Sequence, residues 1–115
     1  VNKKISISSL FNNFPTWLAF DSTPQAITSA TAVNVTTPVT TVATSGAIAL
    51  TLANGAVGQI KIICMTTDGG DATLTPTTLN GYTTITFNTV GDSCILIYNS
   101  TGGWSVIGNN GCTLA

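Results

Sequence analysis

The residues best placed to do chemistry lie at positions 66–76, TTDGGDATLTP, where Asp68 and Asp71 flank Gly69 and Gly70 in a chain with only four acidic residues. Carboxylates at this spacing could bind Ca²⁺, but calcium takes about six to eight oxygen ligands. Only two carboxylates are local, and the alternating acids of an EF-hand are absent. We therefore predict a tight turn in which the glycines take unusual backbone angles and the aspartates cap free amides, with a metal site as the alternative.

Other catalytic groups are scarce. The chain has no His and no Glu, so Ser and Thr hydroxyls lack the usual general base, and a Ser-His-Asp or Cys-His constellation is impossible within it. Lys61 lies in QIKII, where we interpret it as an edge or surface charge. Two acids beside a Gly-Gly turn also lack the apolar pocket that a glycosidase acid requires. We predict no enzyme, no cofactor and no metal; the alternative, a small enzyme, would depend on Asp68 or Asp71.

Two further sets of side chains have alternative interpretations. Tyr98 and Trp104 could form a platform for a sugar, although aromatic residues in strands more often belong to a core or an interface. Cys64, Cys94 and Cys112 each lie in or beside an apolar run, which is typical of small buried hydrophobic residues. One disulfide with a leftover thiol is the alternative for these cysteines.

The composition favours a subunit of a larger assembly. Charged residues make up 6% of the chain and hydrophobic residues 43%, whereas ordinary soluble domains have about 25% charged residues. A hydroxyl or amide that finds a hydrogen bond costs far less to bury than an ion, so such a surface can pack against neighbours on several sides. The alternative is a monomeric secreted domain.

The charge and the N-terminal segment bear on partners. The only cations are Lys3, Lys4 and Lys61, and phosphate neutralisation dominates affinity for nucleic acids, so we predict no nucleic-acid partner.

The first twenty or so residues are too short and polar to span a bilayer, and we predict no membrane partner. Polar residues and Pro15 interrupt their apolar stretch, so we expect them to belong to the mature protein.

Thr, Val and Ile recur at every second position in many stretches, and Gly, Pro, Asn or Asp interrupt these stretches at short intervals. This pattern is typical of an all-β chain. We predict one antiparallel β-sandwich or jelly-roll-like domain over residues 24–115, preceded by an extended N-terminal arm over residues 1–23. The expected strands are 26–36, 39–43, 47–52, 59–66, 72–75, 83–87, 93–98, 104–107 and a short tail near Cys112.

The apolar runs IKIIC and CILIY predict strands that are covered on both faces, one by the core and the other by a partner subunit. Five turns contain a glycine that can take a positive φ at low cost: Asn54-Gly55, Asn80-Gly81, Gly91-Asp92, Gly102-Gly103 and Asn110-Gly111.

Residues 58–111 resemble a β-rich module found near the C-termini of structural proteins of tailed bacteriophages, including cyanophages. The matching pieces are GQIK at Gly58, DGGDATLTP at Asp68, TTITF at Thr83, VGDS at Val90, and a Gly-Trp followed by GNNG at Gly108. The upstream stretch VTTVATSGAIALTLANG is similar to the lead-in strands of that family. The resemblance implies a virion component on the outside of the particle, commonly trimeric or otherwise multimeric, and implies no catalytic residue.

We therefore predict a capsid decoration (cement) protein on the outer surface of an icosahedral head, with the major capsid protein and further copies of itself, as a homotrimer, for partners. The alternative is a receptor-binding fibre or tail-tip module that recognises a host glycan. In the first hypothesis, apolar side chains of the arm anchor the protein to the shell or to a sister subunit. These side chains are Phe11, Phe14, Trp17, Leu18 and Phe20.

Overall fold

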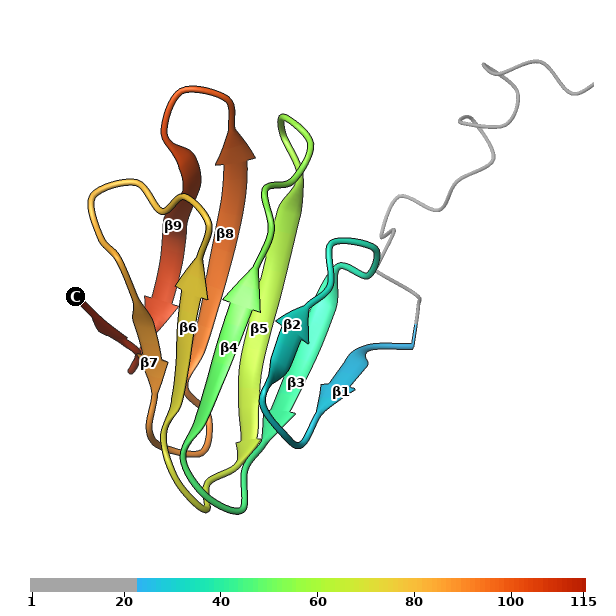
Figure 1. Ribbon diagram of the computed structural model, residues 1–115, viewed down its shortest axis with the longest axis vertical. Helices are drawn as coiled ribbons and strands as arrows, with labels where there is room; N and C mark the ends of the chain where they lie inside the picture. The colour runs from blue at the N-terminus through green and yellow to red at the C-terminus, as the bar shows by residue number, and fades with distance from the viewer. Residues whose placement is uncertain (1–22) are drawn as a thin grey trace, which may run out of the picture.

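A computed structural model describes residues 23–115, which form two five-stranded β-sheets packed face to face (Figure 1). One sheet, sheet A, contains β1 (Gln25–Ile27), β3 (Val39–Ala43), β5 (Ile60–Thr67), β8 (Ser93–Asn99) and β9 (Gly103–Asn110), in that order. The other, sheet B, has the order β10 (Thr113–Leu114), β7 (Ile85–Phe87), β6 (Ala72–Pro76), β4 (Ile48–Leu52) and β2 (Thr31–Val33). None of the described residues forms a helix able to cross a membrane.

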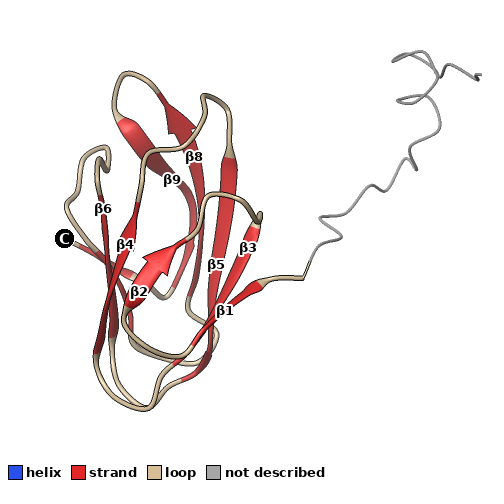
Figure 2. Ribbon diagram, turned by 45° about the vertical axis from the view of Figure 1, so that its right-hand side comes forward, coloured by secondary structure: helices blue, strands red, loops and turns tan. Residues whose placement is uncertain are grey.

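The first six strands alternate between the two sheets, so β1, β3 and β5 are parallel neighbours in sheet A, and β2, β4 and β6 are parallel neighbours in sheet B. Two consecutive strands, one in sheet A and the next in sheet B, form one coil of the chain. The three coils, β1–β2, β3–β4 and β5–β6, stack on one another. The last four strands add antiparallel pairings to both sheets. Figure 2 shows the sheets from a second side, with β4 and β6 in one layer and β5 and β8 in the other.

The predicted all-β sandwich is confirmed, but its sheets are mixed rather than wholly antiparallel. The reason lies in the connections between the first six strands, each of which takes the chain across to the facing sheet instead of back along the same sheet. Successive strands of one sheet are therefore a full coil apart and run in the same direction. The more specific jelly-roll path remains a prediction.

Rows of stacked apolar side chains form the core between the sheets. In sheet A, Ile27, Val42 and Met65 occupy matching positions of three successive coils, and all are buried. In sheet B, Leu50 lies beside Leu74, and Leu74 pairs with Ile85. Burying a large aliphatic side chain contributes about 1.5–3 kcal/mol, so these rows, repeated from coil to coil, stabilise the stack.

Most strand predictions are confirmed within two residues, and one is wrong. The single strand predicted over residues 26–36 is two strands, β1 and β2, on different sheets. Residues 28–30, Thr-Ser-Ala, separate them and contain no Gly, Pro or Asn to signal a turn. The general period-two pattern is confirmed in TTITF, residues 83–87, because Ile85 and Phe87 are fully buried while Thr86 is half-buried.

The turn glycines take positive φ in four of the five predicted turns, at Gly81, Gly91, Gly103 and Gly111. In the remaining turn the positive φ belongs to Gly58, not Gly55. Gly55 instead faces the indole of Trp104, and a Cβ at this position would lie 2.8 Å from that ring.

The predicted arm, with its boundary at residue 23 and its anchors Phe11, Phe14, Trp17, Leu18 and Phe20, lies outside the described residues apart from residue 23 itself.

Candidate functional site

The Asp68–Asp71 turn joins β5 to β6 and stacks directly on the turn of the preceding coil. A Cβ on Gly70 would lie 2.5 Å from the backbone nitrogen of Ala47, and one on Gly69 would lie 2.5 Å from the carbonyl oxygen of Thr44. Neither glycine has a positive φ, so the predicted reason for them is wrong: the two backbones approach too closely for any side chain.

Hydrogen bonds lock the two turns together. The buried hydroxyl of Thr44 donates to the carbonyl oxygen of Gly70 (2.6 Å) and accepts from the amide of Gly69 (3.0 Å). The Asp68 carboxylate accepts from the amide of Gly70 at 3.2 Å, so the predicted capping is confirmed for this aspartate. Within residues 23–115, no group of three or more His, Cys, Asp or Glu side chains is placed to hold a metal ion.

Replacing Asp68 by Asn should lower the free energy of unfolding by about 1 kcal/mol or less, because an amide oxygen can still accept the Gly70 hydrogen bond. Asp71→Asn should be neutral, since Asp71 is exposed and its side chain has no described hydrogen bond. Urea unfolding with and without Ca²⁺ measures both effects. Stabilisation of the wild type by calcium that either variant removes would contradict the turn interpretation.

Lys61 is fully buried, which contradicts its prediction as an edge or surface charge. It lies on the inner face of β5, one of the central strands of sheet A, with Ile63 and Met65. Its ammonium group donates to the carbonyl oxygen of Thr37 (2.7 Å) and to Asn34 Oδ1 (3.2 Å). Lys61 therefore attaches the connection between β2 and β3 to the third coil, and its charge is balanced by neutral oxygens.

Burial lowers the pKa of Lys61 from 10.5 to about 8. Between these two pH values the unfolded chain binds a proton that the folded chain lacks, so the free energy of unfolding should rise as the pH is raised through this window. The gain should be on the order of 3 kcal/mol at most. Urea unfolding from pH 7.5 to 10.5 should give a free energy of unfolding that rises more steeply, or falls less, in the wild type than in Lys61→Met, whose cysteines and tyrosines are unchanged. Equal slopes in the two proteins would refute a lowered pKa for Lys61.

Five aliphatic side chains are neighbours on the side of sheet A that points away from the core, and we call this surface the aliphatic face. They are Val39, Ile60, Ile62, Ile95 and Ile97. These residues are neighbours across strands, since Ile60 pairs with Ile97, and Ile62 pairs with both Ile95 and Val39. Ile60 and Ile95 are each 38% exposed, and the other three are half-buried. The apolar runs IKIIC and CILIY thus have one face in the core, as predicted, and present aliphatic side chains on the other.

Two of the three cysteines are buried, as predicted, and all three thiols are free. The neighbouring Cys112 side chain, together with burial, raises the pKa of the Cys94 thiol. Cys64 is half-buried, pairs with Ser93, and follows Ile62 on the same face of β5. It therefore lies at the border of the aliphatic face, where it is the most accessible thiol of the described residues.

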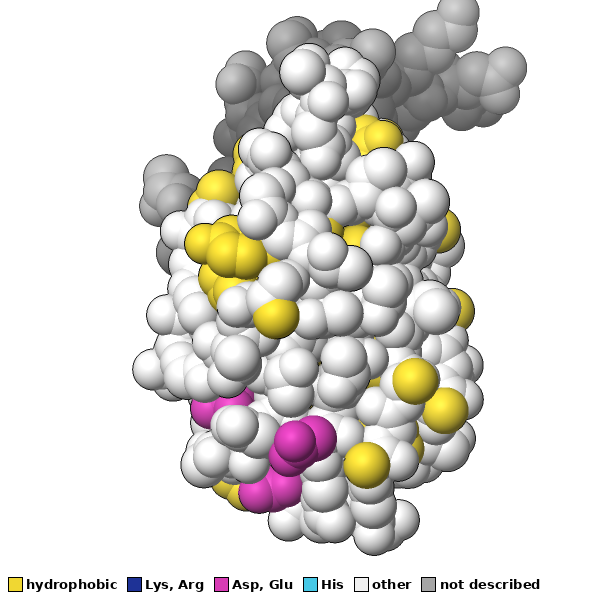
Figure 3. All heavy atoms as spheres, turned by 60° about the vertical axis from the view of Figure 1, so that its left-hand side comes forward, with side chains coloured by type: hydrophobic (Ala, Val, Ile, Leu, Met, Phe, Trp, Pro, Cys, Tyr) yellow, Lys and Arg dark blue, Asp and Glu magenta, His cyan; other side chains and the backbone are white. Residues whose placement is uncertain are grey.

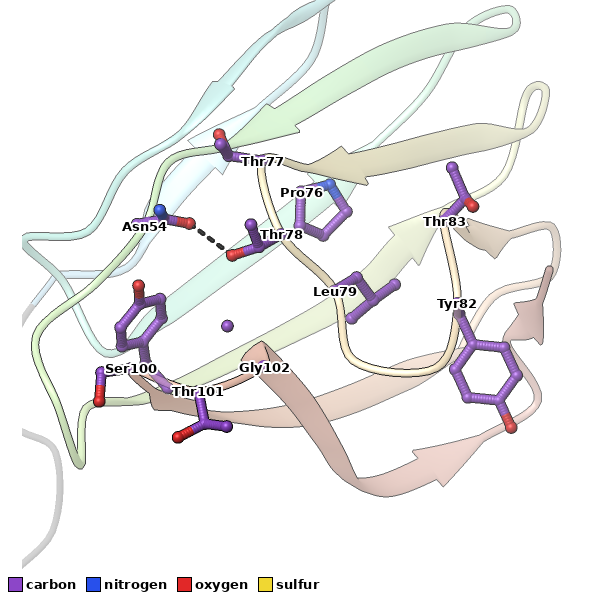
Figure 4. Close-up of a pocket in the computed structure, with 12 residues that line it drawn as sticks. Asn54, Pro76, Thr77, Thr78, Leu79, Tyr82, Thr83, Ser100, Thr101 and Gly102 are labelled. Carbon is purple, nitrogen blue, oxygen red and sulfur yellow. Dashed lines mark hydrogen bonds between the residues drawn. The ribbon is translucent and has the colours of Figure 1, made fainter.

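A groove of about 520 Å³ lies at the end of the sandwich opposite the Asp68–Asp71 turn, between the loop that follows β6 and the turn that joins β8 to β9. Figure 4 shows Asn54, Ser100 and Thr101 at one end of the groove and Tyr82 and Thr83 at the other. Its side chains are mostly hydroxyl-bearing, and none is charged. The sequence interpretation missed Tyr82 and its neighbours; the signal was the clustering of Thr and Ser around the two tyrosines.

The favoured interpretation of a strand aromatic as a core residue is confirmed for Trp104, which is fully buried, so the alternative of a sugar platform does not hold for this residue. Its indole nitrogen donates to the carbonyl oxygen of Ala53 at 2.9 Å, so it is a core residue with a satisfied polar atom. Tyr98 meets the indole edge-to-face, with ring centroids 5.3 Å apart, and remains half-exposed in the lining of the groove.

Charge is nearly absent from the described surface. Lys61 is buried, and the three described acids, Asp68, Asp71 and Asp92, belong to turns at one end of the sandwich. On the face shown in Figure 3 acidic side chains gather at one end and no Lys or Arg is visible. No protein-family model matches the chain, and no curated protein is detectably similar to it.

Proposed function

We propose that this protein is a structural subunit of a bacteriophage virion: a capsid decoration protein that binds the outer surface of the head and stabilises neighbouring capsid subunits by non-covalent adhesion. The observation that carries the proposal is the aliphatic face of sheet A. Apolar side chains that are neighbours on one protein surface often mark a site of protein–protein contact. The resemblance of residues 58–111 to phage structural proteins supplies the kind of particle.

The side chains of the aliphatic face are suited to adhesion. Its side chains are all β-branched, so they lose little rotamer freedom on contact. Each is already partly buried, so one contact contributes modestly, and association costs about 4–15 kcal/mol of lost freedom. A subunit that contacts several neighbours on a lattice meets this cost once for several contacts, and the combined affinity rises accordingly.

The finer parts of the proposal concern residues 1–23 and the assembly. The arm adds a second contact, with Phe11, Phe14, Trp17, Leu18 and Phe20 entering apolar grooves of the major capsid protein or of a sister subunit. The protein acts as a homotrimer, and the surface of sheet A faces either a sister copy or the shell. It neither binds nucleic acid nor enters a membrane, and it performs no catalysis.

Copy number tests this function. Quantitative mass spectrometry of purified virions should find the chain in a fixed ratio to the major capsid protein, at one copy or one trimer per repeated lattice position. A handful of copies per particle would overturn the decoration proposal.

A second function, recognition of a host glycan by a fibre or tail-tip module, is favoured by one specific observation. The groove beside Tyr82 and Tyr98 has no charged side chain, and its hydroxyl groups and tyrosine rings can contact the hydroxyl groups and C–H groups of a sugar. A fibre occupies few positions on a particle, so the same copy-number measurement separates the two functions.

A further inference from the structure

The groove between the β6–β7 loop and the β8–β9 turn has unused hydrogen-bonding groups. Among the described residues, no partner is found for the hydroxyl groups of Thr77, Thr83, Ser100 and Thr101. Thr78 donates to Asn54 Oδ1 at 2.7 Å, which fixes the orientation of that amide and leaves its NH₂ group without a described partner. The groove thus offers several neutral donors and acceptors to a ligand.

We propose that this groove binds a neutral saccharide of one or two units. This inference deepens the second function but holds on either kind of particle, whatever the copy number. A volume of about 520 Å³ falls within the usual range for small-molecule sites, roughly 300–1,000 Å³. Sugars present hydroxyl groups at their edges and C–H groups on their faces, and the groove offers hydroxyl groups together with tyrosine rings.

Electrostatics favours a neutral ligand. No charged side chain lines the groove, so a phosphate, sulfate or carboxylate would lose its water without gaining a counter-charge. The described cation, Lys61, is fully buried. A purely apolar ligand fits poorly as well, because Pro76 and Leu79 are the only aliphatic side chains of the lining.

The groove is held rigidly at its base. Gly103 has φ +79° and packs so closely on Thr78 that no side chain fits between them. Asn99 caps the adjoining turn by accepting from the amides of Thr101 (3.0 Å) and Gly102 (2.8 Å). Trp104 holds the ring of Tyr98 edge-to-face. Binding therefore orders few groups, which lowers its entropic cost.

The test is a titration of ¹⁵N-labelled full-length protein followed by NMR. The probes are N-acetylglucosamine, methyl glucoside, methyl galactoside, methyl mannoside, maltose and cellobiose, with N-acetylneuraminic acid as the anionic comparison. At least one neutral probe should shift amide signals of residues 77–83 and 100–103 at millimolar concentrations. Tyr82→Ala should weaken that binding by an order of magnitude, whereas Val57→Ala, at a more exposed position outside the groove lining, should leave it unchanged.

Three results would overturn the saccharide site: no shift with any neutral probe, equal or tighter binding of the anionic sugar, or equal effects of Tyr82→Ala and Val57→Ala. Both substitutions are at exposed positions, so neither is expected to prevent folding. Failure of this test leaves the decoration proposal standing, because copy number is measured independently.

Discussion

The double substitution Ile62→Lys and Ile95→Lys is expected to abolish binding of the protein to phage heads while leaving its fold intact. The two residues are partners across β5 and β8 at the centre of the aliphatic face. Both side chains point away from the core, so lysines there extend into water in the free protein. In a contact the two ammonium groups would lose their hydration without a partner, at a cost of several kcal/mol.

The outer face of sheet B supplies a matched control. Thr73 and Thr86 are also partners on adjacent strands, and both are half-buried. Thr73→Lys with Thr86→Lys adds the same charge to the opposite side of the sandwich and should preserve binding. Co-sedimentation with heads stripped of the protein measures binding, and thermal unfolding checks the fold. Equal losses in the two double variants, or undiminished binding of the isoleucine variant, would contradict the role of the aliphatic face.

Gly70→Ala is expected to destabilise the protein severely, by about 2–5 kcal/mol. The new Cβ would lie 2.5 Å from Ala47 N and from the carbonyl carbon of Gly46. Both contacts are backbone atoms of the stacked turn, so relief requires the two coils to separate and the Thr44 hydrogen bonds to break.

Gly46→Ala is the control for that substitution, because a Cβ on Gly46 meets no atom within 4 Å and its φ is not positive. It should change the free energy of unfolding by about 0.5 kcal/mol or less. Urea unfolding monitored by tryptophan fluorescence compares the two variants. If Gly70→Ala were as stable as Gly46→Ala, the turns could not be stacked as described.

Much of the fold follows from local patterns. Period-two alternation, and for β5 and β8 continuous apolar runs, predicted β3 through β10 within a few residues, because each strand has a buried face. Alternation does not reveal which strands pair, so the parallel coils were not predicted. The glycines of the Asp68–Asp71 turn were assigned to unusual backbone angles, although their cause is a turn some 25 residues away in the sequence. Such a contact leaves no local signal.

The candidate sites were predictable to different degrees. Isoleucine occupies both faces of β5, so the sequence could not show which alternate set would face the core, and Lys61 was placed outside when it lies inside. The sequence left a surface platform as the alternative to a core position for Trp104, because nothing near this residue in the chain indicates that its ring packs against Gly55. The aliphatic face was foreseen in outline, because runs without alternation predict a second covered face.

The most direct test of the central claim, that the outer face of sheet A is covered in the assembled particle, uses the native thiol of Cys64. Cys94 and Cys112 are buried, so maleimide labelling of the folded protein reports on Cys64. We predict that labelling, located by peptide mass spectrometry, is at least an order of magnitude slower on purified particles than on dilute free protein. Equal labelling rates in the two states would show that this face remains open to solvent and would contradict the account.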